Sequence, residues 1–202
     1  MKLYFSPGAC SLSPHIVLRE SGLAFEPVMA STKTHKLADG TDYYSISPNG
    51  YVPLLELDNG ERLTEGPAIV QYIADQVPAK NLAPANGTMA RYRLQEWLNF
   101  ITSELHKGFS PLFNPAMPEE AKALSRTKVG DRLKWVNTQL EGKQYLMGDT
   151  FSVADAYLFT VAGWAKHVGL DISALTHLGA FVARVSARPA VQAAMKAEGL
   201  IK

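Results

Sequence analysis

The stretch that most constrains the fold runs from residue 49 to residue 74, NGYVPLLELDNGERLTEGPAIVQYIA. A turn and a proline-bounded edge lead into a short apolar strand, the turn DNG at 58–60, and a return strand. A helix start follows at TEGP, residues 64–67, where the threonine hydroxyl can cap the helix and proline fits its first turn. The pattern predicts a β-hairpin that leads directly into a mostly buried helix.

The same layout also predicts a binding surface. Pro53 has no amide hydrogen, so it stops the strand from pairing onward and leaves the Val52 backbone open to an extended peptide. The helix start at Glu65 and Gly66 offers unpaired amides to a carboxylate, and the Glu65 side chain suits an ammonium group. Gly66 has no side chain to block a close approach. The alternative is a buried hairpin and a capped helix that bind nothing.

Strand patterns occur only in the first part of the chain. The expected order there is a strand at 2–5, a helix ending near Gly22, a strand at 25–29, a polar loop, the hairpin and its helix, which together form an α/β layer. Residues 78–87 contain two prolines and read as a linker. Helical spacing follows at 88–107, 118–140, 153–166 and 175–187, and a last short helix at 189–197. The sequence therefore predicts an α/β domain at residues 1–80 and an all-α domain at residues 87–202.

Composition excludes several classes of function. Lys and Arg number 20 and Asp and Glu 19, for a formal charge of +1, which argues against nucleic-acid or membrane-surface binding. No apolar run is long enough to cross a bilayer, so a cytoplasmic location is the default expectation. The histidines are dispersed and Cys10 is the single cysteine, so we expect no metal site and no internal disulfide.

Two other segments carry chemistry. Cys10 follows a glycine turn where a helix should begin, and amides there would lower the pKa of its thiol; the alternative is a small buried filler. In the helix at 88–107, Asn99, Ser103 and His106 fall at i, i+4 and i+7 and therefore share one face. This face could carry functional side chains; the alternative is a stripe of polar residues exposed to solvent. The apolar residues that follow, with Trp164, could wall a pocket or pack the domain core. Ser152 and Asp155 fit a structural helix cap.

The chain resembles the glutathione S-transferases. The VP turn and the TEGPAIVQYIA helix are similar to the glutathione-binding half of that family. The opening MKLYFSPGACSLSPHIVLRESGL and the segment EWLNFITSELHKGFSPLF are similar to its bacterial beta class, and the similarity runs to the closing AEGLIK. The resemblance implies a thioredoxin-like α/β N-terminal domain followed by an all-α C-terminal domain.

The resemblance also implies an activity. The protein would be a transferase that conjugates reduced glutathione to small hydrophobic electrophiles in detoxification, as a cytoplasmic homodimer. Glutathione would be a co-substrate, with no cofactor, nucleic-acid partner or membrane partner. Glutathione-dependent thiol-disulfide or peroxidase chemistry at Cys10 is a second role. A non-enzymatic protein that binds glutathione or apolar ligands is the alternative from another class.

Individual residues take roles from the resemblance. Cys10 and His106 would be catalytic: the first can form a mixed disulfide with glutathione, and the second would lie near its sulfur to donate a hydrogen bond or pass protons. Ser11 and Tyr4 stay open as other groups that hold the thiolate. The implied glutathione-binding set is Cys10, His35, Tyr51, Val52, Pro53, Glu65, Gly66, Asn99, Ser103, Glu104 and His106. The implied electrophile pocket consists of Phe109, Phe113 and Trp164.

Two positions depart from the beta-class pattern. His35 stands where a lysine is common, so His35, Lys33 and Lys36 all remain candidates for binding the glycine carboxylate of glutathione. Tyr51 stands where a glutamine is frequent. The sequence leaves open the physiological electrophile, and whether Cys10 acts in conjugation or only in redox chemistry.

Overall fold

The structure is a computed structural model that describes residues 1–202. The chain divides into two compact units. Unit 1 consists of Met1–Ala83 together with Arg188–Lys202, and unit 2 is Pro84–Ala187. This division differs from the sequence-based boundaries at the C-terminus, because the last helix packs against the first helix of unit 1.

Unit 1 contains a four-stranded mixed sheet in the order β2-β1-β3-β4. The central strand β1 is parallel to β2 and antiparallel to β3, and β3 forms the predicted hairpin with β4. Strands at the predicted positions are confirmed. Their bounds are Lys2–Phe5 for β1, Glu26–Met29 for β2, Leu54–Glu56 for β3 and Arg62–Thr64 for β4.

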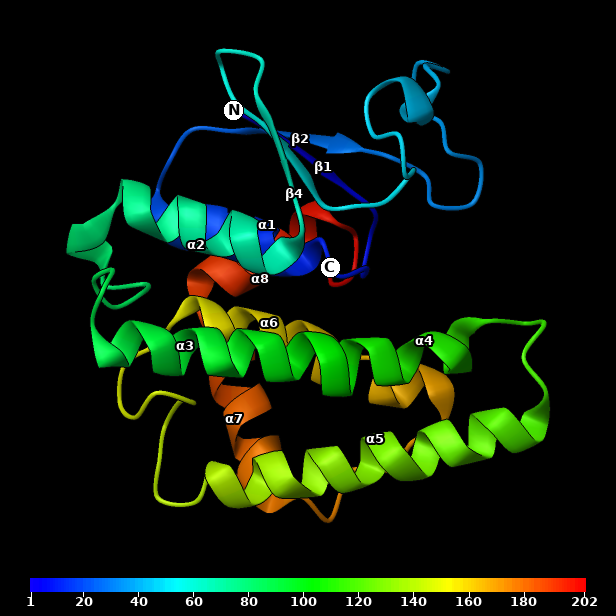
Figure 1. Ribbon diagram of the computed structural model, residues 1–202, viewed down its shortest axis with the longest axis vertical. Helices are drawn as coiled ribbons and strands as arrows, with labels where there is room; N and C mark the ends of the chain where they lie inside the picture. Colours follow the sequence, from blue (N-terminus) through cyan, green and yellow to red (C-terminus); the bar gives the residue numbers. More distant parts are fainter. The chain divides into compact units, whose positions relative to one another are not determined.

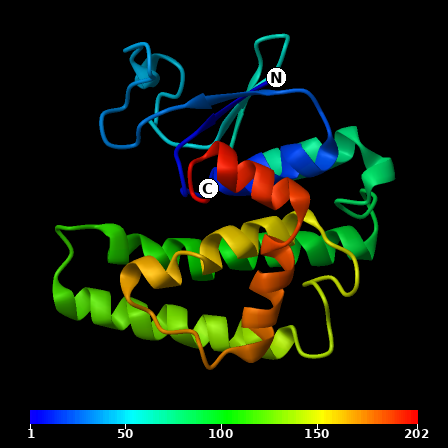
Figure 2. The same cartoon turned by 180° about the vertical axis from the view of Figure 1, so that it is seen from behind.

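Two helices cover one face of this sheet, and a third packs against the first of them. Figure 1 shows α1 (Leu12–Ser21) and α2 (Gly66–Gln76) side by side beneath the strands. Figure 2 shows α8 (Pro189–Ala197), in red, against α1, which is the contact that brings the chain's end into unit 1. Gly22 ends α1 at φ 76°, a conformation that glycine adopts without steric cost. Short 3₁₀ turns, η1 at Tyr43–Ser45 and η2 at Pro78–Lys80, complete the unit.

The start of α2 differs from the prediction in one detail. Thr64 is the last residue of β4 and does not cap the helix. Glu65 is the N-cap residue, with φ 65° and ψ 110°, and its side chain makes no capping hydrogen bond. A single residue thus joins the strand to the helix, and this sharp turn forces Glu65 into a backbone conformation that is costly for any residue except glycine.

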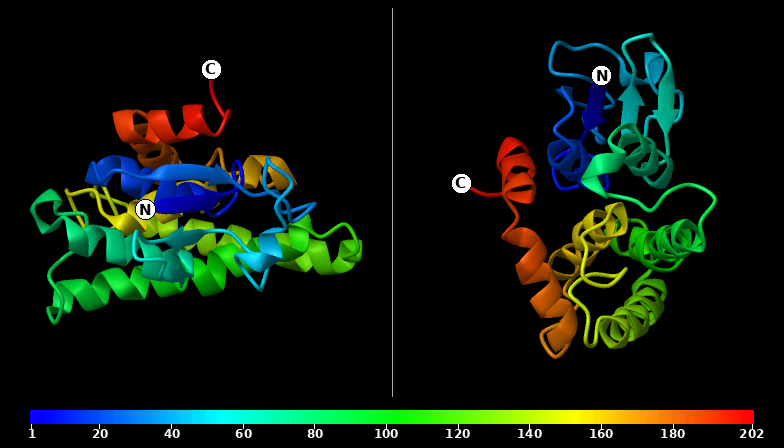
Figure 3. Two further views of the ribbon diagram at one scale, coloured as in Figure 1. Left: turned by 90° about the horizontal axis from the view of Figure 1, so that it is seen from above. Right: turned by 90° about the vertical axis from the view of Figure 1, so that its left-hand side faces the viewer.

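Unit 2 is entirely helical. Figure 1 shows α3, the π-helix η3 and α4 as one continuous rod, with α5 alongside it and α7 crossing α5 steeply. The right-hand view of Figure 3 shows α3 and α5 nearly end on. The predicted helices are confirmed, except that the first is longer and includes the π-helix. The bounds are Met89–Phe100 for α3, Ile101–His106 for η3, Lys107–Phe113 for α4, Glu119–Gln139 for α5, Val153–Ala162 for α6, Ala165–Val168 for the 3₁₀ turn η4 and Thr176–Ser186 for α7.

All residues of the helix α6 are buried. The predicted cap at its start is confirmed. Asp155 Oδ2 accepts hydrogen bonds from the Ser152 amide at 2.8 Å and from the Ser152 hydroxyl at 2.9 Å, and Asp155 Oδ1 accepts one from the Leu146 amide at 2.8 Å. No helix of the chain has both the length and the apolar character that crossing a membrane requires.

Candidate functional site

Cys10 lies in the loop between β1 and α1, and its environment is built from three distant segments. Its thiol donates a hydrogen bond to the Val52 carbonyl oxygen at 3.2 Å. In the same loop, the Gly8 amide donates to Glu198 Oε2 at 2.9 Å, and Glu198 Oε1 lies 2.8 Å from His15 Nδ1. His15 and Glu198 are fully buried side chains, so this contact anchors the loop to the chain's C-terminal end. The sequence analysis missed Glu198, because 190 residues separate it from Gly8.

Ser11 and Tyr4, the two alternatives for holding the thiolate, have structural contacts in unit 1. Ser11 is buried, and its hydroxyl accepts from the Ser6 amide at 3.1 Å and donates to the Ser6 carbonyl at 3.2 Å. Ser11 therefore braces the loop that carries Cys10. Tyr4 packs in a core cluster against Tyr43, at 5.7 Å between ring centroids, and burial raises the pKa of Tyr4. Cys10 is the remaining candidate for sulfur chemistry in unit 1.

The proline-bounded edge has the form that the sequence predicted. The Val52–Pro53 bond is cis, and the Tyr51 carbonyl accepts hydrogen bonds from the Tyr43 hydroxyl at 2.9 Å and the Ser47 hydroxyl at 3.2 Å. Burial raises the pKa of Tyr43 to about 12, which keeps this hydroxyl a donor. The Val52 amide has no hydrogen-bond partner within the chain. This edge can therefore pair with the backbone of an extended ligand.

The start of α2 lies beside that edge. A Cβ atom added to Gly66 would sit 3.8 Å from the Pro53 ring, so the helix N-terminus and the cis-proline turn are neighbours. The Glu65 carbonyl accepts the amides of Ala68 and Ile69 at 3.0 Å each, which starts the helix, while the Glu65 side chain makes no cap. A helix N-terminus favours an anionic group, and the Glu65 carboxylate favours a cationic one.

His35 lies at the neighbouring turn in a tightly packed position. Its backbone has φ 51°, and its ring stacks on Tyr44 with 4.6 Å between centroids. A Cβ atom at Gly50 would come within 2.7 Å of both rings, so only glycine fits there. The Nδ1 atom of His35 is buried with no hydrogen-bond partner. Lys33 and Lys36, the other two candidates for binding the glycine carboxylate, are exposed.

The predicted polar face of unit 2 is altered by the π-helix. The i, i+4, i+7 spacing assumed uninterrupted α-helix, but the wider turn of a π-helix separates Ser103 from His106 in direction. Ser103 is exposed, and its hydroxyl donates to the Asn99 carbonyl at 3.0 Å. Glu104 points toward α5, where its Oε2 lies 2.7 Å from Arg132 Nε and 3.7 Å from Lys128 Nζ. The Arg132 hydrogen bond is the main cause of the lowered pKa of Glu104.

His106 faces the buried helix α6. Its Nδ1 lies 2.7 Å from the Tyr157 hydroxyl, and its ring meets the Trp164 ring edge-on with 5.0 Å between centroids. Burial, and secondarily the positive charge of Lys107, lowers the pKa of His106 to about 4. The imidazole is therefore neutral at neutral pH. The sequence analysis missed Tyr157, whose apolar helical surroundings gave no sign of a polar role.

Of the three predicted pocket residues, Phe109 and Phe113 both contact the ring of the third, Trp164. Phe109 and Phe113 each meet Trp164 edge-on, at 5.8 Å and 5.9 Å between centroids. Phe109 is fully buried, whereas Phe113 is 50% exposed. Phe109 therefore belongs to the core of unit 2, and Phe113 offers an apolar surface next to it.

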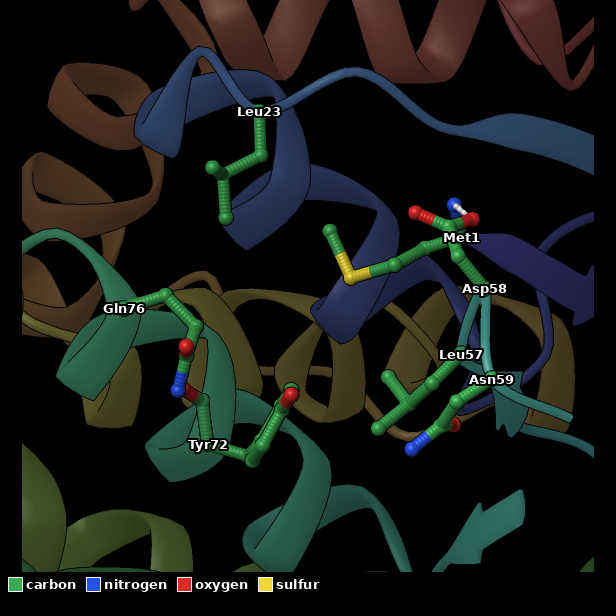
Figure 4. A pocket seen from close by; sticks show the side chains of 7 residues that line it. All are labelled: Met1, Leu23, Leu57, Asp58, Asn59, Tyr72 and Gln76. Carbon is green, nitrogen blue, oxygen red and sulfur yellow. Dashed lines mark hydrogen bonds and ion pairs between the residues drawn. The ribbon is translucent and has the colours of Figure 1, made fainter. Parts of the chain in front are cut away.

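A separate depression in unit 1 contains none of the predicted site residues. Its volume is about 430 Å³, and Figure 4 shows its lining of Met1, Leu23, Leu57, Asp58, Asn59, Tyr72 and Gln76. The α-amino group of Met1 pairs with Asp58 Oδ1 at 2.6 Å across it. No cysteine, serine or histidine lies in this lining, and no cluster of metal-ligating side chains occurs in the chain.

The chain is similar to known proteins along most of its length. Residues 8–76 match the family model described as "Glutathione S-transferase, N-terminal domain", and residues 100–189 match "Glutathione S-transferase, C-terminal domain". A relative from Escherichia coli O157:H7, Glutathione S-transferase GstA, is 48% identical over 200 residues, covering 99% of this chain and 100% of the relative.

Two solved structures are similar along the whole chain. A sphingomonad glutathione S-transferase complexed with glutathione is 51% identical, with a TM-score of 0.96 and full coverage of both chains. The bacterial beta-class enzyme of Sphingomonas chungbukensis is 52% identical, with a TM-score of 0.97 and full coverage of both chains. The fold, a thioredoxin-like unit with a helical unit, and these matches define a glutathione S-transferase. The chain belongs to that family, and within it to the bacterial beta class.

Proposed function

We propose that the protein conjugates reduced glutathione to small hydrophobic electrophiles. The observation that carries the proposal is the edge of unit 1, where the Val52 amide has no partner within the chain, the Cys10 thiol contacts the Val52 carbonyl, and the Glu65–Gly66 helix start lies beside Pro53. Glutathione has a charged amino acid end, followed by a central cysteine residue that has a peptide group on each side and carries the thiol on its side chain. These groups match the helix start, the strand edge and the cysteine loop.

The proposed roles follow from the chemistry of each group. Val52 and Pro53 present the backbone edge, Tyr51 flanks it, and Glu65 and Gly66 bind the ammonium and carboxylate of the γ-glutamyl end. His35, or its neighbour Lys33 or Lys36, binds the glycine carboxylate. In the helical unit, we assign His106 to the glutathione sulfur, and Asn99, Ser103 and Glu104 to further contacts with glutathione. Because the Glu104 carboxylate pairs with Arg132, its contact would use the backbone.

The proposed reaction is nucleophilic substitution or addition. The glutathione thiol loses its proton to solvent, and the thiolate attacks the electrophilic carbon; in an addition, the atom that takes the displaced electron pair is protonated from solvent. A carbon–sulfur bond forms, and in a substitution the leaving group departs with its electron pair. Phe113, with Trp164 behind it, is the proposed apolar surface for the electrophile. No cofactor takes part, because glutathione itself supplies the nucleophile.

A second activity is favoured by the position of Cys10. Its thiolate can attack the mixed disulfide of glutathione with another small thiol, taking over the glutathione as a protein–glutathione disulfide and releasing that thiol. A further glutathione then reduces the protein–glutathione disulfide. Family likeness also supports a cytoplasmic homodimer with residues 1–80 as the glutathione-binding domain, which light scattering and limited proteolysis would test.

Two measurements test the main proposal. Titration calorimetry with reduced glutathione should show binding at millimolar concentrations or below, and a panel of chloronitroaromatic and epoxide electrophiles should give turnover above the uncatalysed rate. Binding with no turnover across the panel would instead support a non-enzymatic binding protein. An absence of glutathione binding would refute both.

A further inference from the structure

A chain of hydrogen-bonding groups connects His106 to the buried helix of unit 2. His106 ends the π-helix η3, and Thr102 lies one turn earlier in the same π-helix. The Tyr157 hydroxyl from α6 lies 2.7 Å from His106 Nδ1 and 3.4 Å from Thr102 Oγ1. Short π-helical segments place side chains where regular α-helix would not, and they often occur at functional sites.

The available donors determine the direction of the hydrogen bonds among Thr102, Tyr157 and His106. Thr102 has one hydroxyl hydrogen, and it donates to the Leu98 carbonyl at 2.8 Å, the shorter of its two contacts. The Tyr157 hydroxyl is closer to His106 Nδ1, at 2.7 Å, than to Thr102 Oγ1, at 3.4 Å. A phenol is a more acidic donor than a neutral imidazole N–H, so the arrangement with Tyr157 donating to Nδ1 is the stronger one.

The tautomer of His106 follows from that direction. A neutral imidazole carries one hydrogen, and the nitrogen that accepts a hydrogen bond cannot carry it. If Nδ1 accepts from Tyr157, the hydrogen is on Nε2. Burial of His106 favours the neutral ring, and the Trp164 ring, packed edge-on against it, restricts its rotation.

We propose that Tyr157 is a positioning residue that fixes His106 as an Nε2–H donor. In this tautomer, His106 can donate a hydrogen bond to a thiolate but cannot accept the proton of a thiol at Nε2. The inference rests on the proposed function only in taking that thiolate to be the sulfur of bound glutathione. The sequence left two roles open for His106, donating a hydrogen bond or passing protons. The proposed tautomer favours hydrogen-bond donation.

The tautomer can be measured without glutathione. Long-range proton–nitrogen NMR spectra of the full chain with ¹⁵N-labelled histidine distinguish protonated from unprotonated ring nitrogens. We expect His106 at pH 7 to show a protonated Nε2 and an unprotonated, hydrogen-bonded Nδ1, with assignment from the His106→Asn spectrum. A protonated Nδ1 would overturn the proposal, because Nε2 would then be a base.

The Tyr157→Phe variant tests the positioning role and keeps the ring in the core. We expect the Nδ1 resonance of His106 to move, and kcat for conjugation to fall by about ten-fold or more with little change in KM for glutathione. Tyr145→Phe removes another buried phenol hydroxyl of unit 2 and should change neither the His106 spectrum nor kcat. Thermal unfolding of both variants checks that they are folded.

The outcomes separate this inference from the proposed function. An unchanged His106 spectrum in Tyr157→Phe, or a changed spectrum with unchanged kcat, would overturn the positioning role. If the wild-type protein conjugated no electrophile, the proposed function would fail, and the NMR spectra would still show whether Tyr157 sets the tautomer.

Discussion

The Cys10 thiol donates a 3.2 Å hydrogen bond to the carbonyl oxygen of Val52, the residue that precedes the cis-proline. The cysteine and the proline-bounded edge are thus in direct contact within unit 1. A glutathione backbone paired along Val52 would therefore bring its own sulfur into the neighbourhood of Cys10. This relationship makes a redox role for Cys10 testable apart from conjugation.

The Cys10→Ser variant should separate the two chemistries. Intact-mass analysis after incubation with glutathione disulfide should show one glutathione attached to the wild-type protein and none to the variant, because Cys10 is the only cysteine. We expect thiol-disulfide activity to be lost and conjugation to be retained within about ten-fold, since serine can still donate to Val52. Loss of conjugation to the uncatalysed rate would place Cys10 in both reactions.

Substitutions at Glu65 should separate backbone strain from charge. Glu65→Gly and Glu65→Ala both remove the carboxylate, so both should weaken glutathione binding by about ten- to a hundred-fold in calorimetry. Glycine tolerates φ 65°, so Glu65→Gly should be more stable in urea unfolding than Glu65→Ala by about 1 kcal/mol. Glu61→Ala, in the exposed hairpin, is the matched control and should bind glutathione normally. Normal binding by both Glu65 variants would refute the ammonium-binding role.

Asp155→Ala should destabilise the protein without a specific catalytic effect. The change removes the acceptor of the Ser152 and Leu146 amides in the buried core, so we expect a loss of about 3 kcal/mol in the free energy of unfolding. Asp131→Ala, which breaks an exposed pair with Lys134, should change it by less than about 0.5 kcal/mol. An Asp155→Ala protein of normal stability that lacked turnover would contradict the structural role.

His106 should make stability depend on pH in a defined window. Its pKa is about 4 when folded and near 6.5 when unfolded, so between these values the unfolded chain binds more protons. This contribution to stability is present at pH 7 and is lost as pH falls from 6.5 to 4, with an upper limit of about 3 kcal/mol.

Urea unfolding from pH 4 to pH 7 measures that contribution by difference. His106→Asn should show a shallower decline in stability than the wild type over this range. His177→Asn, at an exposed position of α7, should keep the wild-type slope. If stability declined equally with pH in the wild type and in His106→Asn, His106 would have the same pKa in the folded and unfolded states.

Glu198→Ala should loosen the cysteine loop from a distance. It removes the acceptor of the Gly8 amide and the partner of the buried His15, so we expect a loss of about 2 to 4 kcal/mol in stability. Cys10 should also react faster with a small alkylating reagent. Lys196→Ala, on the exposed side of α8, should leave both measurements unchanged. An unaltered alkylation rate in a destabilised Glu198→Ala protein would limit Glu198 to a packing role.

Local patterns in the sequence determined most of the elements. The apolar run at 54–57, the DNG turn and the TEGP start at 64–67 predicted the hairpin and α2, because turn and helix-start chemistry is local. The Ser152–Asp155 cap was predictable for the same reason. The cysteine loop and the proline-bounded edge at Val52 could also be recognised from the sequence, but only as two separate features.

Tertiary structure decided how those features meet. Glu198 contacts Gly8, and Tyr157 contacts His106, although no local pattern relates the residues of either pair. The burial that keeps His106 neutral also comes from the folded chain. The π-helix also turned Ser103 and His106 apart, although a regular helix would align them. Short-range backbone preferences act over a few residues, whereas the direction of a side chain and its ionisation depend on neighbours that only the folded chain supplies.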